Sequence, residues 1–363
     1  MNITKERVLS ALSTVEDPDL KKDLVSLGMI QDIVIKGKMV SFSVVLTTPA
    51  CPLKELIKNN CVAALEKEFG DIVPNIFMTS NVTTARNNAP LLPQVKNIIA
   101  IASGKGGVGK STCSSNLAVA LANTGAKVGL IDADISGPSI PTMFNVEAEQ
   151  PAVVQENGKN IIIPIEQYGV KLMSIGFLTP AESAVVWRGP MASSALKQFI
   201  GDVQWGELDY LLIDLPPGTS DIHLTMVQTI PVTGAVIITT PQKVAIADAT
   251  KGLTMFLQPQ INVPILGVVE NMAYFTPEEL PENKYYLFGK EGGQKLSAKF
   301  NVPFLGEIPI VQSIRESGDS GYPAVLKDGI TAEAFTAIAE NLARQVAIRN
   351  AAKNKTEVVQ IKV

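Results

Sequence analysis

Residues 104–111 have the composition and spacing of a loop that binds phosphate groups. They read GKGGVGKS, which fits the pattern G-x-x-x-x-G-K-[ST]. An apolar run at 98–102 precedes them and a helix-like stretch at 111–123 follows, which is the context this pattern requires. Glycines let backbone N–H groups curl around phosphates, and the following helix directs its positive end towards them. We expect a nucleotide to contact the loop and the residue after it: Gly104, Lys105, Gly106, Gly107, Val108, Gly109, Lys110, Ser111 and Thr112.

Carboxylates that could serve a phosphate-bound metal ion follow two apolar runs. The run at 128–131 leads into Asp132 and Asp134, and the run at 210–213 leads into Asp214. Ligands of open α/β sheets bind at the carboxyl ends of the strands, where these residues are expected. One such aspartate alone is more often a helix cap or a turn residue, but three beside a phosphate loop favour hydrolysis of ATP with Mg²⁺.

The residue types suggest separate roles within this site. Lys110 is expected to neutralise the β- and γ-phosphates, and the Ser111 hydroxyl to coordinate Mg²⁺. Asp214 is expected to hold the metal through water, and Asp132 to be a second outer metal partner. Asp134 would orient or deprotonate the attacking water.

The surrounding pattern predicts the scaffold for these residues. Helix-like stretches at 111–123, 193–203, 244–257 and 291–300 alternate with short apolar runs, and a last helix is expected at 331–349. Runs buried on both faces and separated by helices predict an α/β domain with a doubly wound, mostly parallel sheet. The expected strands are 98–102, 128–131, 172–175, 210–213, 235–239, 265–269 and 304–306.

The first 80 residues predict a separate small α+β domain. Helical spacing at 3–14 and 53–69 flanks two alternating runs, 29–35 and 39–46, which are typical of a β-hairpin. Residues 81–96 are polar, contain prolines and are expected to be a linker. The ATPase domain would then span 97–350, with a polar tail at 351–363.

Composition narrows the possible environments and partners. The 363 residues are 46% hydrophobic and carry a formal net charge of −4, which argues against disorder and a broad nucleic-acid surface. No apolar run reaches the roughly 18 residues of a transmembrane helix. Three cysteines do not make a disulfide framework, which fits a reducing cytoplasm.

A second lysine in the phosphate loop, Lys105, resembles the mark of the deviant Walker A ATPases, the group of MinD, ParA and the nitrogenase iron protein. In that group this lysine reaches across a dimer interface to the partner's nucleotide. The resemblance therefore implies that the chain forms a homodimer when it binds ATP.

Four further segments resemble the Mrp/ApbC branch of these ATPases, whose members are described as iron–sulfur cluster carriers or scaffolds. They are DADISGPS at 132–139, WRGPM at 187–191, LIDLPPG at 212–218 and GVVENM at 267–272, and the resemblance covers about 97–345. It implies a dimeric ATP-hydrolysing protein that binds iron–sulfur clusters and transfers them to apoproteins. It also implies that Asn271 contacts the adenine base.

The small domain carries an independent resemblance. Asp17-Pro18 and the segment TTPACP at 47–52 are similar to the MIP18 (DUF59) domain of iron–sulfur assembly factors. Fusion of that domain to this type of ATPase is characteristic of bacterial Mrp proteins.

The cysteines depart from the Mrp/ApbC pattern. Many members carry a C-x-x-C pair after the Glu-Asn-Met segment, whereas 272–281 contains no cysteine here and none follows Cys113. Cys61 and Cys113 are expected in the core. Cys51 precedes Pro52, a favoured first helical residue, so we expect its thiol at a helix N-terminus, where thiolate is stabilised. Cys51 is either a ligand of a labile iron–sulfur cluster or a structural thiol.

Two alternatives compete with the carrier hypothesis. A MinD- or ParA-like positioning or partition switch would bind a membrane or DNA and no cluster. The tail at 346–363 lacks the broad apolar face of a membrane-binding helix, so neither membrane nor nucleic acid is expected as a partner. An iron-protein-like reductase would need more cysteines. His223, the sole histidine, is expected to pack a helix or to act in a switch region.

Overall fold

The structure is a computed structural model that describes residues 3–86, 91–134, 137–156, 158–178, 189–277, 279–280, 282–352 and 356–359. The motif positions 135, 136, 187 and 188, and parts of the expected linker and tail, lie outside the described residues. The chain forms two compact units. The small unit contains Met1–Thr84 and Ala347–Lys353, and the large unit contains Ala85–Val346 and Asn354–Val363.

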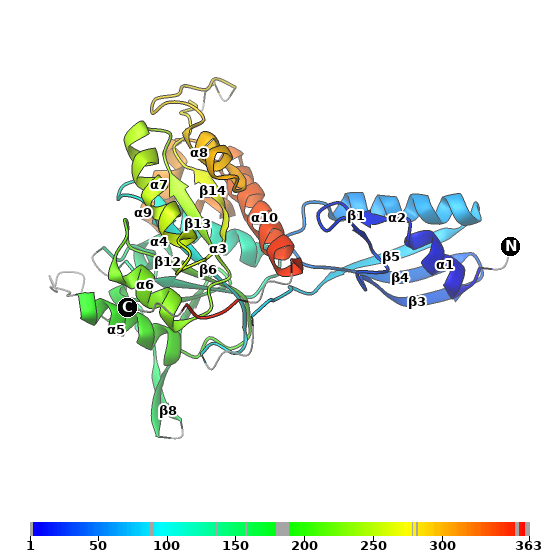
Figure 1. Cartoon of the computed structure of the whole chain (residues 1–363), viewed down its shortest axis with the longest axis horizontal. Helices are drawn as coiled ribbons and strands as arrows, with labels where there is room; N and C mark the ends of the chain where they lie inside the picture. The colour runs from blue at the N-terminus through cyan, green and yellow to red at the C-terminus, as the bar shows by residue number, and fades with distance from the viewer. Residues whose placement is uncertain are drawn as a thin grey trace. The chain divides into compact units, whose positions relative to one another are not determined.

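An eight-stranded sheet forms the centre of the large unit (Figure 1). Its strands run parallel except for the edge strand β10, which is antiparallel to β11. The predicted doubly wound, mostly parallel sheet is therefore confirmed. In spatial order the strands are β10 (Ile165–Gln167), β11 (Val170–Ser174), β7 (Val128–Asp132), β12 (Leu208–Asp214), β6 (Val95–Ser103), β13 (Gly234–Thr239), β14 (Ile265–Glu270) and β15 (Phe304–Glu307).

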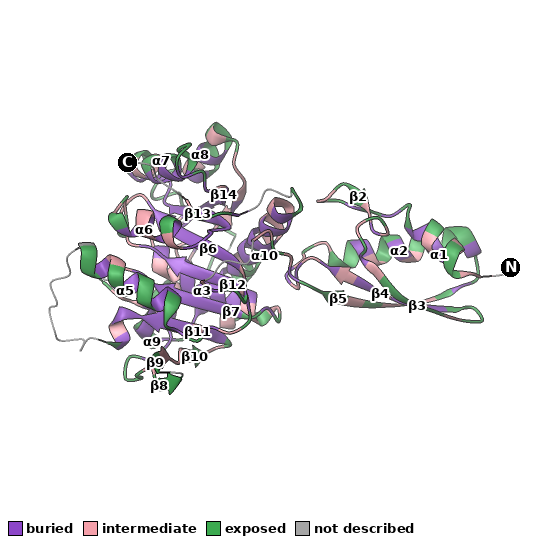
Figure 2. Ribbon diagram, turned by 60° about the horizontal axis from the view of Figure 1, so that its bottom comes forward, coloured by how far each residue is buried: buried purple, intermediate pink, exposed green. Residues whose placement is uncertain are grey.

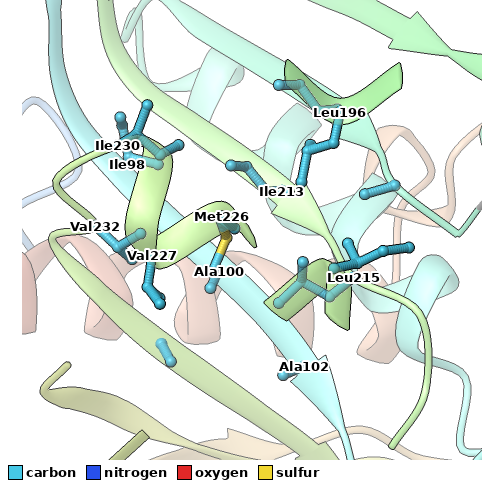
Figure 3. Close-up of a cluster of buried hydrophobic side chains, with 14 of the residues drawn as sticks. Ile98, Ala100, Ala102, Leu196, Ile213, Leu215, Met226, Val227, Ile230 and Val232 are labelled. Atoms are coloured by element: carbon cyan, nitrogen blue, oxygen red, sulfur yellow. The ribbon is translucent and has the colours of Figure 1, made fainter. Parts of the chain in front are cut away.

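The central strands are buried on both faces, as Figure 2 shows for β6, β12 and β13. In Figure 3 the side chains of Ile98 and Ala100 from β6 lie with Ile213 of β12 and Met226 of α6 in one apolar cluster. Alternate strand residues point to opposite faces. Ile99 therefore faces the other side, and it is also fully buried. This double burial explains why the strands read as nearly continuous apolar runs.

Helices cover the two faces of the sheet. The core cluster that contains Ile98 and Ala100 also includes residues from α5 (Gly189–Gly201), α6 (Asp221–Thr229), α7 (Lys243–Leu257) and α8 (Gly292–Phe300). Helix α3 (Lys110–Asn123) packs against β6, β7 and β12. The remaining helical elements of the unit are α4 (Ile140–Met143), η1 (Ile175–Phe177), α9 (Gln312–Ser320), η2 (Ala324–Leu326) and α10 (Ile330–Ala351), whose last residues belong to the small unit.

The sequence did not predict the edge strand β10, the helices α4, α6 and α9, or a separate two-stranded ribbon. A two-stranded ribbon of β8 (Val153–Glu156) and β9 (Lys159–Ile162) lies outside the main sheet and is largely exposed. Strand β6 begins at Val95, two residues before the predicted start of the ATPase domain at position 97. Leu92 is buried in the core cluster that contains Ile98. The end of the predicted linker thus packs with the large unit.

The small unit contains a three-stranded sheet with helices packed on its buried side. Its strands follow the order β3 (Ile30–Lys36), β4 (Met39–Leu46), β5 (Val73–Ser80), and β3 and β4 form the predicted antiparallel pair. Strand β5, which lies parallel to β4, was not predicted. The other elements are α1 (Lys5–Leu12), β1 (Glu16–Asp17), β2 (Lys22–Asp23) and α2 (Lys54–Phe69). No helix in the described part of the chain has the length and apolar character needed to cross a bilayer.

Candidate functional site

The predicted phosphate loop connects the central strand β6 to helix α3. Strand β6 ends at Ser103 and α3 begins at Lys110, and β6 lies between β12 and β13 in the sheet. Gly107 and Gly109 have φ angles of +80° and +78°, in the left-handed region where glycine avoids a Cβ clash. The loop therefore lies at the N-terminus of a 14-residue helix, where backbone N–H groups attract anions.

Two close backbone approaches require glycine in this loop. A Cβ on Gly104 would lie 2.0 Å from the carbonyl carbon of Asp248 in α7. A Cβ on Gly109 would lie 2.2 Å from Asn271 Nδ2. A side chain at Gly104 would therefore collide with the backbone of α7, and one at Gly109 would displace the Asn271 side chain.

Lys110, Ser111 and Asp214 form a compact polar cluster. Lys110 Nζ lies 2.9 Å from Asp214 Oδ1, and the Ser111 hydroxyl donates to Asp214 Oδ2 over 2.6 Å. Asp214 is fully buried and the Lys110 side chain is only 6% exposed. Ser114, four residues after Lys110 on α3, also donates to Asp214 Oδ1 over 2.6 Å. The carboxylate is thus held by one cation and two hydroxyls.

Asp132 lies on the neighbouring strand, paired in register with Asp214. Its carboxylate accepts hydrogen bonds from the N–H groups of Asp134 and Ile140 and from the Ser174 hydroxyl, at 3.2, 3.3 and 3.0 Å. Burial, and next the nearby Asp214 charge, raises the pKa of Asp132 to about 7. Asp132 therefore organises the turn after β7.

Asp134 extends from this turn towards the phosphate loop. Its Oδ2 lies 4.0 Å from Lys110 Nζ, and its side chain is 18% exposed, so it lies nearer to solvent than Asp214. The structure thus brings together all three aspartates, Lys110 and Ser111. Their catalytic and metal-binding roles stay predictions.

Asn271 follows β14 and contacts the phosphate loop directly. Its Nδ2 donates to the carbonyl oxygen of Val108 over 2.8 Å, and the residue is buried. This bond supports the loop from the end of β14, which lies two strands from β6 in the sheet. Contact with an adenine base stays a prediction for Asn271.

The two lysines of the loop differ in their surroundings. Lys110 is buried and paired, whereas Lys105 is half-buried and its ammonium has no ion pair with any residue that the structure describes. The Lys105 carbonyl accepts from the Ser103 hydroxyl over 3.0 Å, so the backbone there is held. Thr112 is half-buried in the first turn of α3, and its carbonyl accepts from Asn116 Nδ2.

Sequence reasoning missed Ser114 and Ser174, the two buried serines that donate to strand-end aspartates. The spacing from Lys110 to Ser114 was a usable signal, because residues four apart share one face of a helix. Ser174, at the end of β11, gave no comparable signal, since only sheet pairing brings it beside Asp132.

The cysteines do not come together in one site. Cys61 on α2 is fully buried, and burial raises its pKa to about 12. Cys113 on α3 is also fully buried, and its pKa is raised for the same reason. Cys51 in the small unit is half-buried. Among the described residues, no group of three or more His, Cys, Asp or Glu side chains could hold a metal ion.

The expected position of Cys51 at a helix start needs correction. Helix α2 begins at Lys54 with Leu53 as its N-cap, so Pro52 is not the first helical residue. The Lys54 N–H instead points back to the Cys51 carbonyl, 3.4 Å away, and closes a turn over these residues. Cys51 therefore lies three positions before the helix.

His223 packs in the interior near the start of α6. The Ser220 N–H donates to His223 Nδ1 over 3.2 Å, and the ring lies beside Phe256. Nε2 is buried and has no hydrogen-bond partner among the residues that the structure describes, and burial lowers the pKa of His223 to about 4. The histidine is therefore neutral at pH 7.

Comparisons with known proteins agree with this geometry. Residues 94–343 match the family model described as NUBPL iron-transfer P-loop NTPase, and residues 5–71 match the model described as iron-sulfur cluster assembly protein. A protein from Synechocystis sp. named iron-sulfur cluster carrier protein is 47% identical, over 95% of this chain and 99% of the relative. One of the same name from Deinococcus radiodurans is 46% identical, over 95% and 96%.

A solved structure is also similar. The nucleotide-binding protein from Archaeoglobus fulgidus, determined in complex with ADP, is 41% identical with a TM-score of 0.57. The similarity covers 65% of this chain and 91% of that protein. The phosphate loop, its buried carboxylates and these matches lead to one conclusion: the chain belongs to the NUBPL-type iron-transfer P-loop NTPases, with an N-terminal domain of the iron–sulfur cluster assembly type.

Proposed function

We propose that this protein binds ATP with Mg²⁺, hydrolyses it as a homodimer, and carries iron–sulfur clusters to recipient apoproteins. The observation that carries the nucleotide part is the buried cluster of Lys110, Ser111 and Asp214 at the start of α3. The carrier part is supported by family membership and by relatives named iron-sulfur cluster carrier protein.

The donor set around the loop fits Mg²⁺. Hydroxyl and carboxylate oxygens are the ligands this ion prefers, and Ser111 and Asp214 supply both within 2.6 Å of each other. Because the Ser111 hydroxyl donates its hydrogen bond to Asp214, the lone pairs of its oxygen are available to a metal. When bound, Mg²⁺ would neutralise charge on the phosphates. Asp214 would then act on the metal through water.

Lys110 and Asp134 would have separate roles in binding phosphate and in orienting water. Lys110 supplies a buried positive charge next to the loop that holds the phosphates. Asp134 is more exposed and has its backbone fixed by Asp132, so its carboxylate could orient the attacking water. The 4.0 Å between Lys110 Nζ and Asp134 Oδ2 keeps these two groups within one site.

Lys105 would complete the site of a second copy. Its ammonium has no ion pair among the described residues, although it belongs to the same loop as the buried Lys110. A half-buried cation in this position suits a phosphate presented by a partner subunit. Dimer formation would then depend on bound ATP.

The cluster is cargo, and Cys51 is the cysteine available to bind it. The thiols of Cys61 and Cys113 are fully buried. Thiolates are the usual ligands of iron–sulfur clusters. One Cys51 from each protomer would supply two ligands, so other donors or a recipient protein would complete the coordination.

Nucleotide binding and dimerisation can be tested with the two loop lysines. Lys110→Ala is expected to abolish binding of a fluorescent ATP analogue. Lys105→Ala is expected to retain binding but lose ATP-dependent dimerisation and most hydrolysis. Equilibrium binding, light scattering and phosphate release measure the three properties. Unchanged turnover in Lys105→Ala would exclude a role for Lys105 across the dimer.

Anaerobic reconstitution tests the cargo. The wild type and Cys61→Ala should take up iron and sulfide with a visible absorption band, and Cys51→Ala should not. Transfer to an apo-ferredoxin would then show carrier activity. If the wild type binds no cluster, the carrier proposal fails while the ATPase proposal stands.

A further inference from the structure

Behind the predicted metal site lies a buried hydroxyl that neither the motif nor the family comparison assigns. Ser114 is fully buried on α3, and its Oγ lies 2.6 Å from Asp214 Oδ1. We propose that Ser114 is a positioning residue for Mg²⁺: it holds Asp214 Oδ1 so that Oδ2 stays turned towards Ser111. This inference rests on the proposed nucleotide site.

The proton of Ser114 has two possible acceptors. Oγ lies 3.0 Å from the Lys110 carbonyl oxygen and 2.6 Å from Asp214 Oδ1. A hydroxyl has a single proton, and the shorter distance lies in the range of charge-assisted O–H···O⁻ bonds. The Lys110 carbonyl is moreover the acceptor for the Ser114 N–H in the regular pattern of helix α3. The Ser114 hydroxyl therefore keeps its proton and donates its hydrogen bond to the Asp214 carboxylate.

The two oxygens of Asp214 have different partners. Oδ1 forms an ion pair with Lys110 Nζ at 2.9 Å and accepts a hydrogen bond from Ser114. Oδ2 accepts a hydrogen bond from the Ser111 hydroxyl at 2.6 Å. When Lys110 turns to the phosphates, Ser114 is the donor that remains on Oδ1 within the described part of the chain. Without it, the carboxylate could rotate about its Cβ–Cγ bond, and Oδ2 would lose its fixed direction.

Partners that orient a metal-binding carboxylate typically change metal affinity or activity by 10- to 100-fold when they are removed. Ser114→Ala should therefore raise the Mg²⁺ concentration needed for half of its effect on nucleotide binding by about tenfold or more. It should leave metal-free nucleotide binding unchanged, because the backbone of the phosphate loop is intact.

The neighbouring Ser115 provides a matched control. It is also buried, lies on the same helix, and its hydroxyl points to Met143 Sδ at 3.4 Å. Successive helical residues are rotated by about 100°, so Ser115 does not face Asp214. Ser114→Thr is the conservative variant, because a helical threonine hydroxyl can adopt the same position next to the carbonyl four residues earlier.

The test is a Mg²⁺ titration of full-length protein with a fluorescent, non-hydrolysable ATP analogue, repeated in EDTA. We expect the Mg²⁺ concentration at half-effect to rise at least tenfold in Ser114→Ala, to stay at the wild-type value in Ser115→Ala, and to recover in Ser114→Thr. Mn²⁺ electron paramagnetic resonance, which measures the free ion, gives the same comparison without a fluorophore.

Other outcomes overturn the proposal. Equal Mg²⁺ dependence in Ser114→Ala and Ser115→Ala would remove the positioning role. Weaker binding of Ser114→Ala in EDTA, with a matching loss of thermal stability, would show a structural role instead. If the wild type itself binds no nucleotide, the nucleotide site fails, and this inference fails with it.

Discussion

The ammonium of Lys110 and the carboxylate of Asp214 lie 2.9 Å apart, with exposures of 6% and 0%. They come from the first residue of α3 and the last residue of β12. A buried ion pair stabilises little when both partners are present, but the loss of one partner leaves a charge without compensation. This pair therefore links the stability of the large unit to Lys110, the group that we expect to bind phosphate.

A double-mutant cycle measures this link. Lys110→Met or Asp214→Asn alone should each lower the free energy of unfolding by about 3 kcal/mol, because each removes the nearest opposite charge from a buried ionised group. The double variant should lose less than the sum. Urea unfolding of nucleotide-free protein is the measurement. The exposed pair Lys127–Glu207, in the same unit, is the control and should show no measurable coupling. Additive effects at Lys110 and Asp214 would contradict the prediction.

Gly109→Ala should disturb the loop more than Gly107→Ala. Both positions have positive φ, so both variants carry a backbone cost of about 1–2 kcal/mol. Only at Gly109 would the new Cβ also meet Asn271 Nδ2, because nothing lies within 4 Å of a Cβ on Gly107. Thermal unfolding without nucleotide should show the larger loss for Gly109→Ala. Asn271→Ala should restore part of that loss, and equal losses in the two single variants would argue against the contact.

The three thiols should differ sharply in reactivity at pH 8. Alkylation requires thiolate, and the pKa of about 12 leaves Cys61 almost wholly protonated at this pH. Cys113 is buried with a raised pKa as well, whereas Cys51 is half-buried. Mass spectrometry after brief treatment with iodoacetamide should find Cys51 modified in native protein, and all three cysteines after denaturation. Labelling of Cys113 at the rate of Cys51 would contradict the burial.

His223 should make the large unit less stable in acid. Its pKa is about 4 in the folded protein against an ordinary value of 6.5, so between these values the unfolded chain binds more protons. The free energy of unfolding should fall by up to about 3 kcal/mol as the pH decreases from 6.5 to 4. Above pH 6.5 His223 is neutral in both the folded and the unfolded chain, so it no longer lowers the free energy of unfolding.

The control variant for this pH effect is His223→Gln. Glutamine at this position can still accept from the Ser220 N–H, as in other capping boxes, but it does not titrate. Urea midpoints at pH 7 and pH 4.5 should differ less in the variant than in the wild type. The same pH dependence in both proteins would assign the acid sensitivity to other groups.

Local patterns in the sequence were sufficient for the phosphate loop and most of the sheet. The loop depends on glycines and a lysine at fixed spacing, and double burial of strands such as β6 produces apolar runs that are visible without a partner strand. Sequence reasoning missed strand β5 and the β8–β9 ribbon because many of their residues are exposed or polar. Hydrogen bonding to a partner strand defines them as strands.

The turn after Cys51 shows the limit of a local rule. Pro52 is a favoured first helical residue, yet α2 starts at Lys54 because the preceding residues close a turn of their own. Two acceptable local structures compete here, and the residue type at position 52 does not by itself decide between them.

The sequence by itself determined which residues could hold phosphate and metal, because the types and spacing at 104–111 and the aspartates after two apolar runs are local properties. Only the tertiary structure decided how they meet. Sheet register places Asp132 beside Asp214, and the packing of α3 brings Ser114 to that carboxylate. The end of β14 brings Asn271 to the loop. These contacts join segments more than 80 residues apart, and their distances depend on strand order and helix packing, which no short stretch of sequence encodes.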